Sequence, residues 1–147
     1  MKIMAVDFGD TRTGLAMCDR TEFLATPLGI ITEKSLPKTV EKIVYAAREY
    51  EAAMVVVGLP RNMNGSEGER AQKCRKVATL LQNIMPDIPI ELWDERNSTK
   101  SAIYYMNETD TRGKKRKEVL DAAAASIILE SYLAYRKNQK EASEKQE

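Results

Sequence analysis

Acidic residues occupy three places in this chain where a buried carboxylate is costly unless it binds a cation. Asp7 ends the apolar segment MKIMAV, the pair Asp94 and Glu95 follows the apolar segment Ile88–Trp93, and Asp121 interrupts the stretch VLDAAAASII. Carboxylates gathered at the edge of a core repel one another, and a divalent cation such as Mg²⁺ (or Mn²⁺) relieves that repulsion. These positions favour a metal site.

Each of these acids also has a purely structural interpretation. Asp7 could end its strand through a side-chain turn, and Asp121 could cap a helix that begins at Ala122. Side chains alternate along a strand, so only one of Asp94 and Glu95 can readily point toward Asp7. The sequence does not say which of the two it is.

The chemistry open to the chain is limited because none of its 147 residues is a histidine. This excludes Ser-His-Asp and Cys-His nucleophilic catalysis and histidine-bound zinc. Two divalent ions held by carboxylates can instead activate water and stabilise the leaving oxygen in phosphodiester cleavage. The composition is therefore suited to a metal-dependent nuclease.

A basic segment and a polar loop could contact nucleic acid. The segment Arg112–Lys117 places five cations in six positions, and the polar loop Gly58–Gly65 leads toward a helix N-terminus, where backbone NH groups can receive a phosphate. Arg96 could bind a phosphate or pair with its acidic neighbours, and the segments could equally be a solvated loop and a turn. Together with Arg96, the candidate contacts are Arg61, Asn64, Arg112, Lys114, Lys115, Arg116 and Lys117.

Hydrophobic patterning predicts the elements that would position these residues. Strands are expected at 2–8, 13–18, 23–32, 53–59 and 88–93, the first three as an antiparallel meander. Helices are expected at 36–50 with Ser35 as N-cap, from a capping box at Ser66–Glu69 to about residue 85, briefly after Asn97 or Ser98, and at 119–136. This order predicts an α/β, ribonuclease H-like fold with a five-stranded mixed sheet flanked by helices. We expect one domain over residues 1–136 and a disordered polar tail at 137–147.

Bulk composition sets the class of protein. The residues are 43% hydrophobic and 31% charged, the net charge is +1, and no apolar run is long enough to span a membrane. The N-terminus lacks the features of a signal peptide, and Cys18 and Cys74 belong to no CxxC pattern. We therefore expect reduced, buried thiols and a cytoplasmic location.

Four blocks of the chain resemble the YqgF (RuvX) family: AVDFGDTRTGLA, VVVGLPRNMNGSEGERA, WDERNST and KKRKEVLDAAAASIILESYL. Together they span roughly residues 2–136. The resemblance implies a ribonuclease H-like fold related to the RuvC resolvases. It places Asp7, the pair Asp94/Glu95 and Asp121 at the metal site, with Asp7, Glu95 (or Asp94) and Asp121 as the expected ligands. Arg12, Asn64, Gly65 and Arg96 fall on other positions typical of the family.

The function implied by the resemblance is an endonuclease that resolves Holliday junctions or matures the 5′ end of 16S ribosomal RNA from its precursor. A two-metal carboxylate mechanism with Mg²⁺ or Mn²⁺ follows, with structured nucleic acid as partner and a monomer or homodimer as active form. The alternative is a non-catalytic nucleic-acid-binding module that assists ribosome assembly or transcription. A third alternative is a nucleotide-binding relative of sugar kinases, whose first phosphate loop also has the pattern Asp-x-Gly. That fold needs a second lobe with a second phosphate motif.

Overall fold

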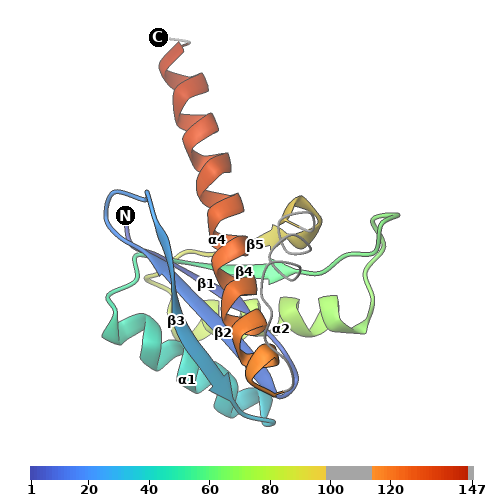
Figure 1. The fold of residues 1–147 in the computed structure, drawn as a ribbon. Helices are drawn as coiled ribbons and strands as arrows, with labels where there is room; N and C mark the ends of the chain where they lie inside the picture. The colour runs from blue at the N-terminus through green and yellow to red at the C-terminus, as the bar shows by residue number, and fades with distance from the viewer. Residues whose placement is uncertain (99–113, 146–147) are drawn as a thin grey trace.

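The computed structural model describes the backbone of residues 1–98 and 114–145 and the side chains of residues 1–97 and 123–144. A five-stranded mixed sheet in the order β3-β2-β1-β4-β5 forms its centre (Figure 1). Its strands are β1 (Ile3–Asp7), β2 (Arg12–Cys18), β3 (Ala25–Thr32), β4 (Met54–Leu59) and β5 (Ile90–Asp94). The helices are α1 (Leu36–Glu49), α2 (Glu69–Ile84) and α4 (Lys114–Lys145), with a 3-10 turn η1 (Glu95–Ser98).

The pairing of the strands confirms the predicted meander and mixed sheet. β2 pairs antiparallel with both β1 and β3, whereas β4 is parallel to β1 and to β5. Parallel neighbours require crossover connections, which α1 and α2 supply. The carboxyl ends of β1, β4 and β5 therefore meet at one edge of the sheet, where the predicted acids follow two of these strands.

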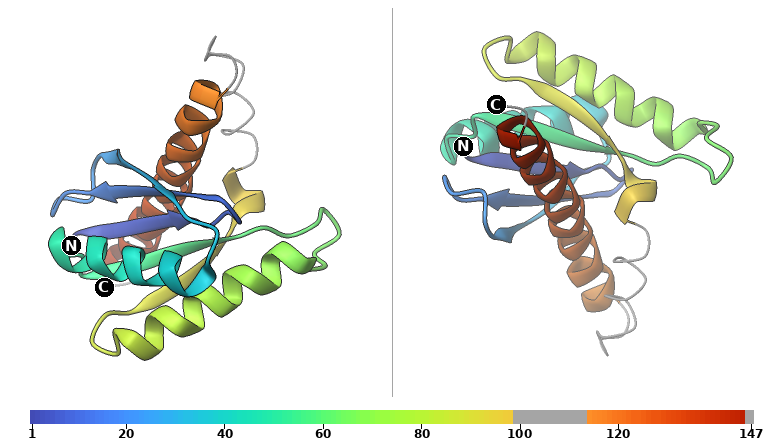
Figure 2. Two further views of the ribbon diagram at one scale, coloured as in Figure 1. Left: turned by 90° about the horizontal axis from the view of Figure 1, so that it is seen from below. Right: turned by 90° about the horizontal axis from the view of Figure 1, so that it is seen from above.

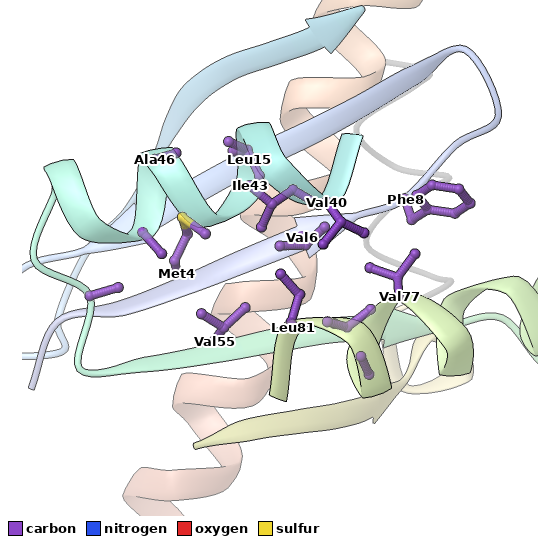
Figure 3. Packing of buried hydrophobic residues seen from close by; sticks show 14 of the residues in the cluster. Met4, Val6, Phe8, Leu15, Val40, Ile43, Ala46, Val55, Val77 and Leu81 are labelled. Carbon is purple, nitrogen blue, oxygen red and sulfur yellow. The ribbon is translucent and has the colours of Figure 1, made fainter. Parts of the chain in front are cut away.

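Helices cover both faces of the sheet, so the central strands are apolar on both sides. Figure 2 shows α1 and α2 on one face and α4 crossing the other. Met4 and Val6 of β1 pack beneath α1 and α2, as Figure 3 shows from close by. Ile3 and Ala5 point the other way and pack against α4. Every residue of β1 is consequently buried, which explains its unbroken apolar sequence.

The caps of α1 and α2 differ in how well the sequence predicts them. Ser35 caps α1 as expected, because its hydroxyl accepts a hydrogen bond from the backbone NH of Lys38. The prediction of a capping box at Ser66–Glu69 is wrong, because the N-cap of α2 is Gly68 and no side chain caps the helix. The Ser66 hydroxyl is instead bonded to the side chains of Asn62 and Asn64. It closes the preceding loop, so α2 begins only at Glu69.

The last helix is longer than its apolar pattern predicts. α4 runs over Lys114–Lys145, so the basic residues from Lys114 to Lys117 form its first turn and residues 137–145, expected as a disordered tail, are helical. The end of α4 extends away from the sheet (Figure 1), and residues 137–144 are all exposed. Lys, Glu, Ala and Gln have high helix propensity, and extending an existing helix needs no new nucleus. The predicted short helix after Ser98 lies outside the described residues.

Polar contacts fix α4 across the sheet. Tyr132 donates a hydrogen bond to the Glu91 carboxylate, and the indole NH of Trp93 donates to Ser131. Burial and the neighbouring Glu91 raise the pKa of Tyr132 to about 12, so its hydroxyl remains a donor. No helix in the described part of the chain is long and apolar enough to cross a membrane.

Glu22, in the turn between β2 and β3, ties this end of the sheet to α4. Its carboxylate lies 2.6 Å from Nε of Arg136 and 2.8 Å from the N-terminal ammonium. Hydrogen bonding from Arg136, followed by that from the N-terminus, lowers the pKa of Glu22 to about 2. The stabilisation is present above the unfolded-state pKa of about 4.5 and is lost as the pH falls through about 2.

We expect Glu22→Gln to lower the free energy of unfolding at pH 7 by about 1 kcal/mol, because an ionised acceptor of two charged donors is removed. Urea unfolding at pH 7, 4 and 2 should show the difference from the unsubstituted protein shrinking toward zero at the lowest pH. Glu33→Gln, which removes a half-buried carboxylate paired with one cation, Lys42, where Glu22 has two, is the control and should change stability less. A difference that persists at pH 2 would contradict this assignment.

Candidate active site

Asp7 lies where β1 ends, and among the described residues it is the one charged residue that is buried, with 9% of its surface exposed. The turn that follows requires Gly9, because a Cβ there would lie 2.2 Å from the carbonyl oxygen of Arg12. The chain can therefore fold back directly into β2. Asp7 is therefore held at a tight strand end.

Gly58 is the neighbour of Asp7 on the adjacent parallel strand. The register pairs Val6 with Val57, so the next residues of β1 and β4, Asp7 and Gly58, lie side by side. Side chains alternate along each strand, and both positions belong to the face that packs against α4. An acid on β1 thus lies beside a position on β4 that carries no side chain.

The Glu95 carboxylate occupies the space above Gly58. A Cβ built on Gly58 would lie 2.9 Å from Oε1 of Glu95 and 2.7 Å from Cδ1 of Ile128 on α4. Glu95 is the first residue of η1, where the chain turns after β5. Its carboxylate therefore lies over β4, on the sheet face that Asp7 shares, and the two acids approach this face from the ends of β1 and β5.

Asp94 points elsewhere, although it is the immediate neighbour of Glu95. It accepts hydrogen bonds from the Arg96 guanidinium, the shortest of 2.7 Å, and lies 3.8 Å from Nη1 of Arg61. Hydrogen bonding from Arg96, with a smaller effect of Arg61, lowers the pKa of Asp94. Asp94 is thereby ionised and paired with arginines. Of the two acids that sequence could not separate, Glu95 is the one whose carboxylate lies over Gly58, the neighbour of Asp7.

Arg61 joins this arginine network to the loop between β4 and α2. Its guanidinium lies 3.4 Å from Glu67, which also forms a bidentate pair with Arg75. The Arg75 hydrogen bonds are the main reason that the pKa of Glu67 is lowered. Nε of Arg61 is buried and has no hydrogen-bond partner among the described residues. Arg61 therefore links the loop to the end of β5, because it lies between the carboxylates of Glu67 and Asp94.

The other candidate contacts in this region lie at the same edge of the sheet. Asn64 accepts hydrogen bonds from the backbone NH and hydroxyl of Ser66, so its side chain shapes the loop. Gly65 adopts a φ of +88°, and a Cβ there would lie 3.6 Å from Nη1 of Arg96. Arg12 begins β2, directly after the turn that follows Asp7. The structure thus places Arg61 and Arg96 against Asp94, Asn64 in the loop that leads to α2, and Arg12 at the start of β2.

The remaining predicted residues fall wholly or partly outside the described part of the chain. Asp121 is on α4, seven residues before Ile128, which places both positions on one helix face about 10 Å apart along the axis. Lys114, Lys115, Arg116 and Lys117 form the first turn of α4, and Arg112 lies outside the described residues. Among the described side chains, no group of three or more acids, cysteines or histidines could hold a metal.

Arg70 is a site residue that the sequence interpretation missed. It lies in the first turn of α2, its Nη2 is 3.7 Å from Oδ1 of Asp7, and it donates a hydrogen bond to the carbonyl oxygen of Phe8. Its side chain is 60% exposed, so it reaches the site from the solvent edge. The sequence feature that could have indicated Arg70 is its place as a cation at the start of a helix that follows a polar loop.

Cys74 lies beneath this region and takes no part in its chemistry. Burial, and then the negative charge of Glu95, raises the pKa of its thiol to about 12. The thiol is therefore protonated, since a thiolate is needed for nucleophilic attack. Cys18 is also buried, and both cysteines are free, as predicted.

Comparison with known proteins identifies the family of this chain. The family described as "RuvX: Holliday junction resolvase" matches residues 1–135. A protein of Halothermothrix orenii named "Putative pre-16S rRNA nuclease" is 42% identical over 135 residues, which are 92% of this chain and 96% of that protein. One of the same name from Thermoanaerobacter pseudethanolicus is 42% identical over 139 residues, covering 94% and 99%.

Solved structures show the same fold at low sequence identity. RuvC of T. thermophilus in complex with a Holliday junction superposes with a TM-score of 0.61 at 11% identity, covering 92% of this chain and 96% of RuvC. The fowlpox virus resolvase bound to junction DNA gives a TM-score of 0.59 at 14% identity, covering 92% and 98%. These matches confirm the ribonuclease H-like fold. The family match over residues 1–135 and the relatives at about 40% identity show that this chain belongs to the RuvX (YqgF) family.

Proposed function

We propose that this protein is a divalent-metal-dependent endonuclease that acts on structured nucleic acid in the cytoplasm, with the 5′ end of the 16S ribosomal RNA precursor as its principal substrate. The observation that carries the proposal is the convergence of Asp7 and Glu95 on one face, at the carboxyl ends of β1 and β5. Ligand sites of open α/β sheets lie at this edge. The names of the relatives, which specify a pre-16S rRNA nuclease, direct the choice of substrate.

The residues at this edge fit a magnesium or manganese site. Carboxylate oxygens are the ligands that these ions prefer, and Gly58 leaves space for the Glu95 carboxylate beside Asp7. Asp121 would complete the ligand set from α4. When bound, a pair of such ions supplies an activated water and stabilises the leaving oxygen in phosphodiester cleavage.

The cations around the acids would hold the substrate. Arg61 and Arg96 are oriented by Asp94 and can present guanidinium groups to backbone phosphates. Arg70 lies beside Asp7 and can contact a phosphate placed near that carboxylate. Arg12 and the basic segment Arg112–Lys117 would extend the contact along the nucleic acid. Asp94 acts in this scheme as a positioning residue and not as a metal ligand.

Asp7→Asn should reduce cleavage of a 16S precursor fragment by at least about 100-fold in Mg²⁺ or Mn²⁺, because a ligand at the reacting centre is lost. The matched control is Asp10→Asn, which changes a 73% exposed carboxylate paired with Lys73 and should retain activity. A four-way DNA junction tested in parallel, with the oligomeric state measured on the same sample, separates the two substrates, since a two-fold junction calls for a dimer.

Equal cleavage by Asp7→Asn and the unsubstituted protein would overturn the catalytic proposal. Binding of RNA without cleavage of either substrate would favour the non-catalytic module instead.

Substitutions at the acidic pair should separate metal binding from substrate binding. We expect Glu95→Gln to weaken Mn²⁺ binding about 10- to 100-fold and Asp94→Asn to leave it nearly unchanged. Asp94→Asn should instead weaken RNA binding, because Arg61 and Arg96 lose the carboxylate that orients them. Titration of Mn²⁺ followed by electron paramagnetic resonance, and filter binding of RNA, measure the two effects. The same loss of Mn²⁺ affinity in both variants would contradict the division of roles.

The contribution of the basic segment can be measured from the salt dependence of binding. Replacing Lys114, Lys115 and Lys117 together by Gln should reduce the slope of log K against log salt by about two to three, since each phosphate contact contributes about 0.7–0.9. Replacing three lysines of the α4 extension, Lys137, Lys140 and Lys145, changes the net charge equally and serves as the control. Equal slopes for the two triple variants would show that only net charge matters.

A further inference from the structure

Gly58 is an unusual residue for its place in the sheet. It lies near the end of β4, whose other residues, Met54, Val55, Val56, Val57 and Leu59, are large and buried. Glycine weakens a strand interior by roughly 0.5–1 kcal/mol relative to alanine. Its backbone does not need glycine, because the described glycines with positive φ are Gly29 and Gly65 only. The reason for glycine must therefore lie in the space around it.

That space is filled by two side-chain ends. The Cβ of any other residue would lie 2.7 Å from Cδ1 of Ile128 and 2.9 Å from Oε1 of Glu95, with Cδ of Glu95 at 3.2 Å. Real Cβ contacts are longer than this, so at least one of the two side chains would have to move. Ile128 is only 2% exposed and is packed in the core beneath α4, whereas Glu95 is half-buried at the sheet edge. Glu95 has the freer path outward.

We infer that Gly58 is a positioning residue of the metal site, because its missing side chain lets the Glu95 carboxylate lie across β4 beside Asp7. The inference rests on the proposed function for the identity of the ligand. It has a further consequence: a carboxylate can reach this place either from Glu95 or from position 58 itself. Moving the acid from one position to the other should therefore rebuild the site.

The first experiment separates displacement of Glu95 from strain in the core. Gly58→Ala should weaken Mn²⁺ binding about 10- to 100-fold, the range found when the support of a metal ligand is lost. Ile128→Val removes Cδ1, the atom that meets the new methyl group, so Gly58→Ala/Ile128→Val should regain thermal stability without regaining Mn²⁺ affinity. Gly68→Ala is the control, because a Cβ there meets nothing within 4 Å. Recovery of Mn²⁺ affinity in the double variant would assign the effect to packing against α4 and overturn the inference.

The second experiment relocates the carboxylate. Glu95→Ala should lose Mn²⁺ affinity, and Gly58→Asp in that background should recover most of it, because the removed side chain vacates the space. Gly58→Asn in the same background has the same shape without the charge and should not recover. Equal Mn²⁺ affinities of the Glu95→Ala/Gly58→Asp and Glu95→Ala/Gly58→Asn variants would overturn the inference.

The outcomes distinguish this inference from the proposed function. If the unsubstituted protein binds no Mn²⁺ and cleaves neither substrate, the metal-dependent nuclease itself is wrong. If it binds Mn²⁺ and cleaves RNA while Gly58→Ala does both equally well, the nuclease stands and the role of Gly58 is wrong. Electron paramagnetic resonance of Mn²⁺ gives the affinity in each case without depending on turnover.

Discussion

The parallel pairing of β1 with β4 is the constraint on which the site depends. It places Asp7 beside Gly58, and it fixes which face of the sheet each of them occupies. Parallel pairing in turn requires a crossover connection, and both crossovers of this sheet run over the face covered by α1 and α2. The opposite face is left to α4, whose residue Ile128 packs over Gly58. The acids thus converge between the sheet and a single helix.

The charges at the sheet edge fall into two groups with different surroundings. Asp94 and Glu67 belong to the loop side of the sheet, where Arg61, Arg75 and Arg96 pair with them. These carboxylates are ionised and satisfied within the protein, and their effect is to hold arginines in place. Glu95 lies across Gly58 on the α4 face, next to Asp7. The division would let two adjacent acids in one DER triplet serve different parts of the proposed function, Asp94 in substrate binding and Glu95 in metal binding.

Contacts far from the edge keep α4 in the position that the site requires. Glu22 holds Arg136, Tyr132 bonds to Glu91, and Trp93 bonds to Ser131, so α4 is attached to the β2–β3 turn and to β5. A helix fixed at these points cannot readily rotate about its axis. The positions of Ile128 over Gly58 and of Asp121 two turns earlier then follow from the helical repeat.

The sequence by itself determined the strand and helix order, the meander, the cap at Ser35 and the candidate acids, because these depend on apolar periodicity and on local residue types. It misplaced the start of α2, since Ser66 bonds to Asn62 and Asn64 across the loop, and it missed Arg70, whose distance to Asp7 depends on how α2 packs. Alternation put Asp94 and Glu95 on opposite faces of β5, but it could not say which face Asp7 shares. Only the tertiary structure decided that point, because the pairing of β4 with both β1 and β5 aligns the faces of strands that are distant in the chain. The same pairing explains the glycine at position 58. Its missing side chain leaves the space over β4 in which the Glu95 carboxylate lies, next to the position of Asp7.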